Sequence, residues 1–169
     1  MARIAAIITD WFEDAEYTTP ADKFREAGHE VVTVGDRPGE TVEGKRGEAR
    51  VRVEKDVKKV SPDDFDALLI PGGFSPDNLR VDENAVQFVK GFMDREKPVF
   101  SICHGAQLLI TADVLEGRKV TGWKSIIQDL INAGAEYEDR EVVVDGNLVS
   151  SRHPGDLPAF VRESLQLMG

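Results

Sequence analysis

Short apolar runs alternate with longer amphipathic segments along this chain. The apolar runs lie at residues 4–8, 31–34, 67–70 and 98–102. Continuous runs of this length are typical of strands that are covered on both faces. Helical spacing, or helix start and stop signals, mark the segments at about 19–27, 84–95, 123–132 and 156–168, and a further helix begins at 106. The alternation predicts an α/β fold with a mostly parallel sheet sandwiched between helices.

Two segments break this alternation. Residues 37–59 contain several glycines and an alternating apolar pattern, so we expect short antiparallel strands at an edge rather than a helix. Residues 141–144 and 148–151 flank Asp145-Gly146-Asn147, a strong signal for a β-hairpin. Both segments therefore predict antiparallel additions to the parallel sheet.

Proline, glycine and aspartate set the expected helix limits. Pro20 is typical of a first turn and Gly28 of a helix end, so the first helix is expected to begin close to Pro20. Asp156 is the expected N-cap of the last helix, with Pro158 in its first turn. No repeat, low-complexity tract or linker interrupts the pattern, and residues 1–169 are predicted to form a single domain.

Composition narrows the class of protein. Hydrophobic residues make up 41% and charged residues 31% of the chain, as in globular proteins, and no apolar run is long enough for a membrane. The net charge of −10 disfavours nucleic acid as a partner, and the basic pair Lys45-Arg46 is interpreted as part of a solvated strand pair. With no signal peptide and a single cysteine, the expected location is cytoplasmic.

Three predicted strand ends carry the residues that could take part in catalysis or binding. They are Asp10 to Asp14, Pro71-Gly72-Gly73 and Cys103-His104-Gly105. Sites in open α/β sheets form beyond the carboxyl ends of the strands, so these three loops are expected to converge. The three histidines show no metal-ligand spacing, and we expect neither a metal nor a cofactor.

Cys103 stands where a strand turns directly into a helix. Such a nucleophile elbow strains its residue and needs small neighbours, which Gly105 and Ala106 provide. The helix N-terminus behind it favours negative charge, so the thiol is expected to ionise more easily than a free one. His104 could then act as a general base. The alternatives are an inert core cysteine and a histidine that only packs.

Two motifs, 70–73 (Ile-Pro-Gly-Gly) and 101–107 (Ser-Ile-Cys-His-Gly-Ala-Gln), carry a family resemblance. Segments at 12–14, 117–119, 129–136, 141–147 and 150–152 fit the same pattern. Together they resemble the PfpI branch of the DJ-1/PfpI superfamily over essentially the whole chain. The resemblance implies a flavodoxin-like fold, also similar to class I glutamine amidotransferases.

The resemblance also implies a role for each site residue. Cys103 looks like the nucleophile, His104 like the adjacent catalytic histidine, and Glu13 like the acid that hydrogen-bonds the sulfur. One member of the Glu13–Cys103 pair is expected to hold a proton, because two buried like charges in contact are costly. The backbone N–H groups of Gly73 and His104 would form the oxyanion hole. Asp77 stands where the family's proteases have a glutamate, one methylene longer, contributed by a neighbouring subunit.

Trp123 replaces a tyrosine that often lines the family's pocket, so the pocket is expected to be narrower and to lack a hydroxyl. The resemblance implies a cysteine-dependent hydrolase or lyase in stress protection, with small reactive carbonyls (glyoxalase or deglycase activity) or short peptides (protease activity) as substrates. Self-association into a dimer or hexamer is expected. The alternative is a redox sensor whose Cys103 is oxidised, with little catalysis; a plain binding protein would leave the elbow unexplained.

Overall fold

A seven-stranded sheet forms the centre of the protein, described here through a computed structural model of residues 1–169. Its strands run in the order β10-β11-β7-β6-β1-β2-β5. Their bounds are β1 (Arg3–Ile7), β2 (Glu30–Gly35), β5 (Lys55–Asp56), β6 (Ala67–Ile70), β7 (Val99–Ile102), β10 (Val143–Asp145) and β11 (Leu148–Ser151). All neighbours are parallel except β10 and β11. The predicted parallel sheet and the C-terminal hairpin are confirmed.

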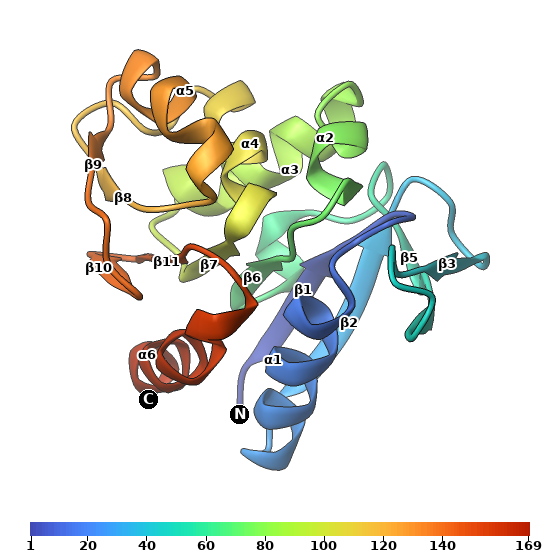
Figure 1. Cartoon of the computed structure of the whole chain (residues 1–169). Helices are drawn as coiled ribbons and strands as arrows, with labels where there is room; N and C mark the ends of the chain where they lie inside the picture. The colour runs from blue at the N-terminus through green and yellow to red at the C-terminus, as the bar shows by residue number, and fades with distance from the viewer.

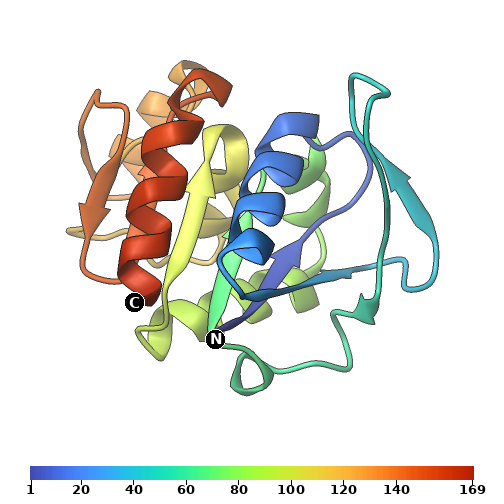
Figure 2. The same cartoon turned by 90° about the horizontal axis from the view of Figure 1, so that it is seen from below.

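Helices cover both faces of this sheet (Figure 1). One layer contains α1 (Asp14–Glu26) and α6 (Leu157–Met168), which lie side by side in Figure 2. The other contains α2 (Ser75–Leu79), α3 (Glu83–Asp94), α4 (Ala106–Thr111) and α5 (Ile127–Asn132). Alternate residues of β6 enter two separate apolar cores, with Leu68 and Ile70 in one and Ala67 and Leu69 in the other. The fully apolar sequence of β6 follows from this burial on two faces.

Smaller elements complete the fold. Strands β3 (Thr41–Glu43) and β4 (Arg50–Arg52) form the antiparallel pair predicted within residues 37–59. Strand β5 instead joins the edge of the main sheet, parallel to β2. The sequence did not predict α2 or the parallel pair β8 (Lys119–Val120) and β9 (Glu136–Tyr137). Single 3-10 turns lie at Pro62–Asp64, Cys103–Gly105, Lys124–Ile126 and Pro154–Asp156. None of the helices has the length and apolar composition that crossing a membrane requires.

Two expected helix limits need correction. Helix α1 begins at Asp14 and encloses Pro20, because the charged residues of its first turn are buried and bonded instead of solvated. Asp156 occupies the N-cap position of α6 as predicted, but its carboxylate caps no helical N–H. It accepts hydrogen bonds from the backbone and guanidinium of Arg152 at 2.9 and 3.0 Å instead. The earlier start of α1 changes which acid lies beside the thiol in the site.

Candidate active site

The loops that follow β1, β6 and β7 meet at the carboxyl edge of the sheet, as the topology predicts. The N–H of Glu13 donates to the carbonyl of Gly72 at 3.1 Å, and the N–H of Phe74 donates to the carbonyl of Trp11 at 2.8 Å. Strands β1, β6 and β7 are neighbours in the sheet, so Cys103 lies directly beside these two joined loops.

Cys103 forms a strained elbow. Its φ of 61° lies in the left-handed region that non-glycine residues seldom adopt. A Cβ at Gly105 would lie 2.5 Å from the carbonyl oxygen of Ile70, so only glycine allows the turn to pack this closely on β6. The backbone N–H groups of His104 and Gly73 both donate to the cysteine sulfur. Two amides in this arrangement can stabilise an oxyanion on a carbon bonded to that sulfur.

The carboxyl group beside the sulfur belongs to Glu16. Glu16 lies in the first turn of α1, is fully buried and contacts the Cys103 thiol. Its Oε1 accepts the N–H of Gly72 at 2.8 Å, and its Oε2 has no hydrogen-bond partner in the chain. A Cβ at Gly72 would lie 2.5 Å from Oε1 of Glu16 and 2.9 Å from Cβ of Cys103. The absence of a side chain at Gly72 therefore lets the acid and the thiol meet.

Glu13 does not hold the sulfur, and this assignment from the resemblance is corrected. Its carboxylate shares the pocket, but Oε1 accepts from Nε of Arg46 at 2.6 Å and Oε2 from Nζ of Lys45 at 2.8 Å. The physical reason is the earlier start of α1, which directs Glu16 toward the thiol one turn further along the chain. Asp14 and Glu16 are two acids of the kind that mark the first turn of a helix, and this signal could have suggested the earlier start of α1.

Burial controls the protonation of the pair. It raises the pKa of Glu16 to about 8, against the hydrogen bond from Gly72, and the nearby charge of Glu13 adds to the rise. Burial also raises the pKa of the Cys103 thiol, and the Glu16 carboxylate raises it further, although the amides of His104 and Gly73 oppose both effects. The expectation of an easily ionised thiol is therefore wrong for the resting site. The acid–thiol pair that was expected to hold a proton is therefore Glu16 with Cys103, and not Glu13 with Cys103.

His104 bridges the thiol and a serine. Its Nδ1 lies 3.4 Å from the sulfur and its Nε2 lies 3.3 Å from Oγ of Ser125, a residue that sequence reasoning missed. Burial, and then the charge of Lys45, lower the pKa of His104 below its ordinary value of 6.5. The imidazole is therefore neutral at pH 7 and able to accept a proton.

The pocket above the sulfur has a volume of ≈ 170 Å³. Its lining residues are Glu13, Glu16, Lys45, Arg46, Cys103, His104, Trp123 and Pro154. The β3–β4 loop supplies Lys45 and Arg46, so these residues are not the purely solvated strand pair that the sequence suggested. Trp123 forms one wall, with its ring 6.3 Å from that of His104. No group of three His, Cys, Asp or Glu side chains could hold a metal ion.

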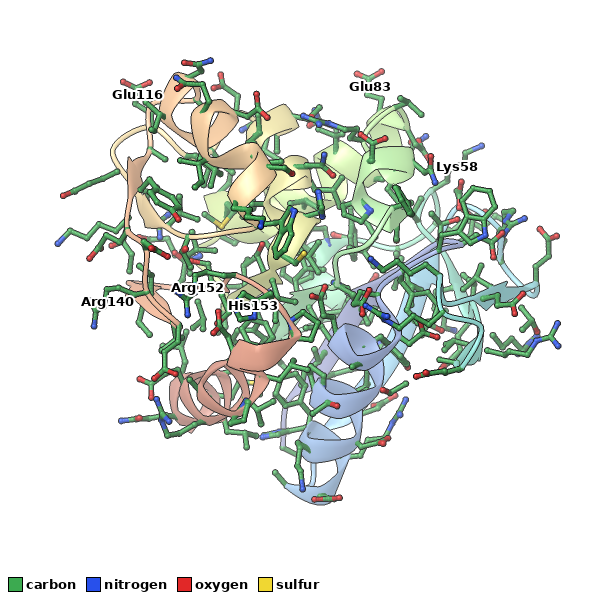
Figure 3. All side chains as sticks on the ribbon, viewed as in Figure 1. Lys58, Glu83, Glu116, Arg140, Arg152 and His153 are labelled. Carbon is green, nitrogen blue, oxygen red and sulfur yellow. The ribbon has the colours of Figure 1, made fainter.

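Asp77 lies outside this pocket. It belongs to α2, where its side chain is 60% exposed and its Oδ1 lies 3.9 Å from the guanidinium of Arg80. His153, labelled near Arg152 in Figure 3, packs edge-on against Trp123, with ring centroids 6.4 Å apart. The chain itself therefore unites Cys103, His104 and the two amides, whereas Asp77 acts on His104 only through its charge.

Asp14 holds the β3–β4 loop against the site. Its buried carboxylate accepts the N–H groups of Arg46, Glu48 and Ala49 at 2.8–3.0 Å. Burial alone would raise its pKa, but these hydrogen bonds outweigh burial and lower the pKa below the ordinary 3.8. Asp14 thus places Lys45 and Arg46 over the thiol.

Replacement Asp14→Ala is expected to lower the free energy of unfolding by about 2–3 kcal/mol, because it leaves buried donors without an acceptor. Urea denaturation at pH 7 measures the loss. A lowered folded-state pKa gives stability that is present above the ordinary 3.8 and is lost as pH falls through the folded value. The difference between wild type and variant should therefore shrink in acid, and a constant difference would contradict this account.

The fold and the elbow cysteine define a class of α/β proteins built around a strand-to-helix nucleophile turn. The model of the DJ-1/PfpI family matches residues 2–167, and the chain belongs to this family.

Known relatives match along the whole chain. Protein/nucleic acid deglycase 2 of Escherichia coli (strain K12) is 59% identical over 168 residues, which are 99% of this chain and 98% of the relative. General stress protein 18 of Bacillus subtilis (strain 168) is 57% identical over 167 residues, 98% of this chain and 97% of the relative. A solved two-domain protein from Anabaena variabilis, with DJ-1/ThiJ/PfpI-like and ferritin-like domains, is 41% identical with a TM-score of 0.98, and the match covers 100% of this chain and 48% of that one.

Proposed function

We propose that this protein is a cysteine-dependent PfpI-type enzyme that acts on small reactive carbonyl compounds, or on the adducts they form, in protection against stress. The observation that carries the proposal is the pair of amides, from Gly73 and His104, that points to the Cys103 sulfur. The names of the deglycase and stress-protein relatives support the same chemistry.

The reaction begins when the sulfur of Cys103 attacks the carbonyl carbon. A carbon–sulfur bond forms, the carbonyl π electrons move to oxygen, and the Gly73 and His104 amides stabilise the resulting oxyanion. The thiol proton passes to Nδ1 of His104, the neutral base 3.4 Å from the sulfur. With methylglyoxal, a proton shift within the adduct gives a thioester, and water hydrolyses it to lactate and the free thiol.

The size of the pocket favours small carbonyls over peptides. A pocket of ≈ 170 Å³ with Trp123 as one wall suits a small carbonyl compound and is too small for a folded segment of chain. The test measures lactate from methylglyoxal and release from a fluorogenic short peptide, with protein alkylated at Cys103 as the blank. Lactate formation without peptide cleavage is expected. Peptide cleavage without lactate would replace this proposal by a peptidase.

We also propose that Asp77 completes the site of a neighbouring copy. Its exposure on α2, outside the pocket of its own chain, supports this arrangement. Activity per chain should then fall at least about tenfold on dilution into the monomer range, because each chain loses a site residue. Sedimentation and turnover are measured at the same concentrations, and a fully active monomer would contradict the shared site.

The redox-sensing alternative receives less support. Cys103 is the single cysteine, it is 8% exposed, and burial raises its pKa, whereas oxidation requires an accessible thiolate. Mild peroxide followed by mass spectrometry tests this reading, and fast selective oxidation of Cys103 would restore it.

A lone unpaired cysteine supports the proposal that the protein works in the reducing cytoplasm.

A further inference from the structure

Two cations line the pocket around Cys103 in a protein whose net charge is −10. These cations are Lys45 and Arg46, and both contact the carboxylate of Glu13. The pKa of Glu16, raised to about 8, keeps this carboxyl protonated at pH 7, and His104 is neutral there. Two cations thus share one ion-pair acid at the pocket, while the charges of Glu48 and Asp14 also act on Arg46.

The two cations retain unused hydrogen-bond donors. Glu13 accepts from Nε of Arg46 and from Nζ of Lys45, and neither side chain donates another hydrogen bond within the chain. Both terminal nitrogens of the guanidinium are therefore free. The Glu13 side chain is 5% exposed, whereas Lys45 is 34% and Arg46 is 57% exposed. The acid thus lies behind the cations, whose free donors reach the opening of the pocket.

Backbone contacts hold these cations in position. The N–H of Lys45 donates to the carbonyl of Phe12 at 2.9 Å, and the N–H of Arg46 donates to the carboxylate of Asp14 at 2.9 Å. The charge of Lys45 acts on Glu16, Cys103 and His104 alike. Positioned donors with a field at the thiol are what an anion site requires.

We propose that Lys45 and Arg46 form an anion subsite that selects carbonyl substrates with a carboxylate next to the reacting carbon, as in glyoxylate. A planar guanidinium matches a carboxylate, and a pocket of ≈ 170 Å³ suits a substrate as small as glyoxylate. The carbonyl carbon bonds to the Cys103 sulfur, the π electrons move to oxygen, and the thiol proton ends on that oxygen as a hemithioacetal. The inference rests on the proposed reaction of Cys103 with carbonyls.

Two alkylating reagents of similar shape test the subsite without any turnover. Iodoacetate carries a carboxylate and iodoacetamide is neutral, so the ratio of their rates with Cys103 reports selection for an anion. The ratio cancels changes in the reactivity of the thiol itself. We expect Lys45→Gln and Arg46→Gln each to lower it roughly fivefold, as the loss of one nearby charge predicts.

Matched controls remove a charge elsewhere. Lys58 extends from the periphery of the molecule (Figure 3), and Arg50 lies on the same hairpin with an exposed side chain outside the pocket. Lys58→Gln and Arg50→Gln should leave the ratio unchanged. Equal ratios in wild type and in both pocket variants would overturn the subsite. The rate with iodoacetamide verifies in each variant that the elbow is intact.

Competition identifies the kind of anion. Acetate should slow alkylation by iodoacetate at lower concentrations than inorganic phosphate, and the reverse order would overturn the assignment to carboxylates. The outcome is independent of the proposed enzyme activity. Selection for iodoacetate without lactate formation would support the subsite while removing the proposed function, and lactate formation without selection would do the opposite.

Discussion

Replacement of Cys103 by alanine is expected to lower lactate formation from methylglyoxal by at least about a thousandfold. The sulfur forms the covalent bond on which every later step depends, and no second cysteine can replace it. Lactate is measured enzymatically with the two purified proteins at equal concentration. Circular dichroism should show the same fold, because the change removes one buried sulfur atom and leaves the elbow backbone unchanged.

The matched control is Ser125→Ala, which removes a hydroxyl that contacts His104 but not the sulfur. This variant should retain most of the activity, within about tenfold, because a single hydrogen bond to a neutral imidazole contributes modestly. Lactate formation by Cys103→Ala near the wild-type rate would show that the reaction does not pass through a bond to this sulfur.

Replacement of Glu16 by glutamine is expected to shift the pH dependence of thiol alkylation. In wild type, Glu16 and Cys103 titrate as a coupled pair, and the first proton leaves as pH rises through about 8. Glutamine removes the carboxylate charge that, above pH 8, raises the pKa of the Cys103 thiol, although burial still keeps that pKa above the ordinary 9.0. Alkylation should therefore reach its midpoint at a lower pH than in wild type, and the rate at pH 9 should rise by about tenfold, since each unit of pKa is a factor of ten in thiolate.

Iodoacetamide alkylation between pH 6 and 10 measures both midpoints. The matched control is Glu13→Gln, which removes an acid of the same pocket that Lys45 and Arg46 hold away from the sulfur. Its midpoint should stay near or slightly below that of wild type, because the Glu13 charge contributes to the raised pKa of Glu16. A large downward shift in Glu13→Gln and none in Glu16→Gln would reverse the assignment of the acid.

The same replacement affects stability with a definite sign. The folded-state pKa of Glu16 is raised from 4.5 to about 8, so its contribution to stability is fully present below 4.5 and is lost as pH rises through 8. Glutamine mimics the protonated acid and does not titrate. Denaturation midpoints of wild type should therefore fall relative to Glu16→Gln between pH 5 and pH 9.

Local patterns were sufficient for much of the architecture. The apolar run of β6 and the turn residues between β10 and β11 each act within a few residues, so pairing and burial follow from nearby chemistry. The same holds for the elbow at Cys103, where a strand, a cysteine and small residues are contiguous. The convergence of three loops followed from the parallel order of the strands.

Residues that act across long sequence distances could not be assigned this way. Glu16 resembles a solvated acid in the sequence, and its burial depends on where α1 begins and on the missing side chain of Gly72. Lys45 and Arg46 reach the thiol because Asp14 bonds their loop from the far side of the pocket. Each placement depends on packing between elements that are distant in the chain.

By itself, then, the sequence determined the class of fold and the nucleophile elbow, because local hydrophobic pattern and backbone geometry are short-range properties; the amides that face the sulfur were implied by the family resemblance. Only the tertiary structure decided which carboxyl meets the thiol and how both are protonated. Burial raises the pKa of Glu16 and Cys103 together, and desolvation arises only when separate elements close over a group and exclude water.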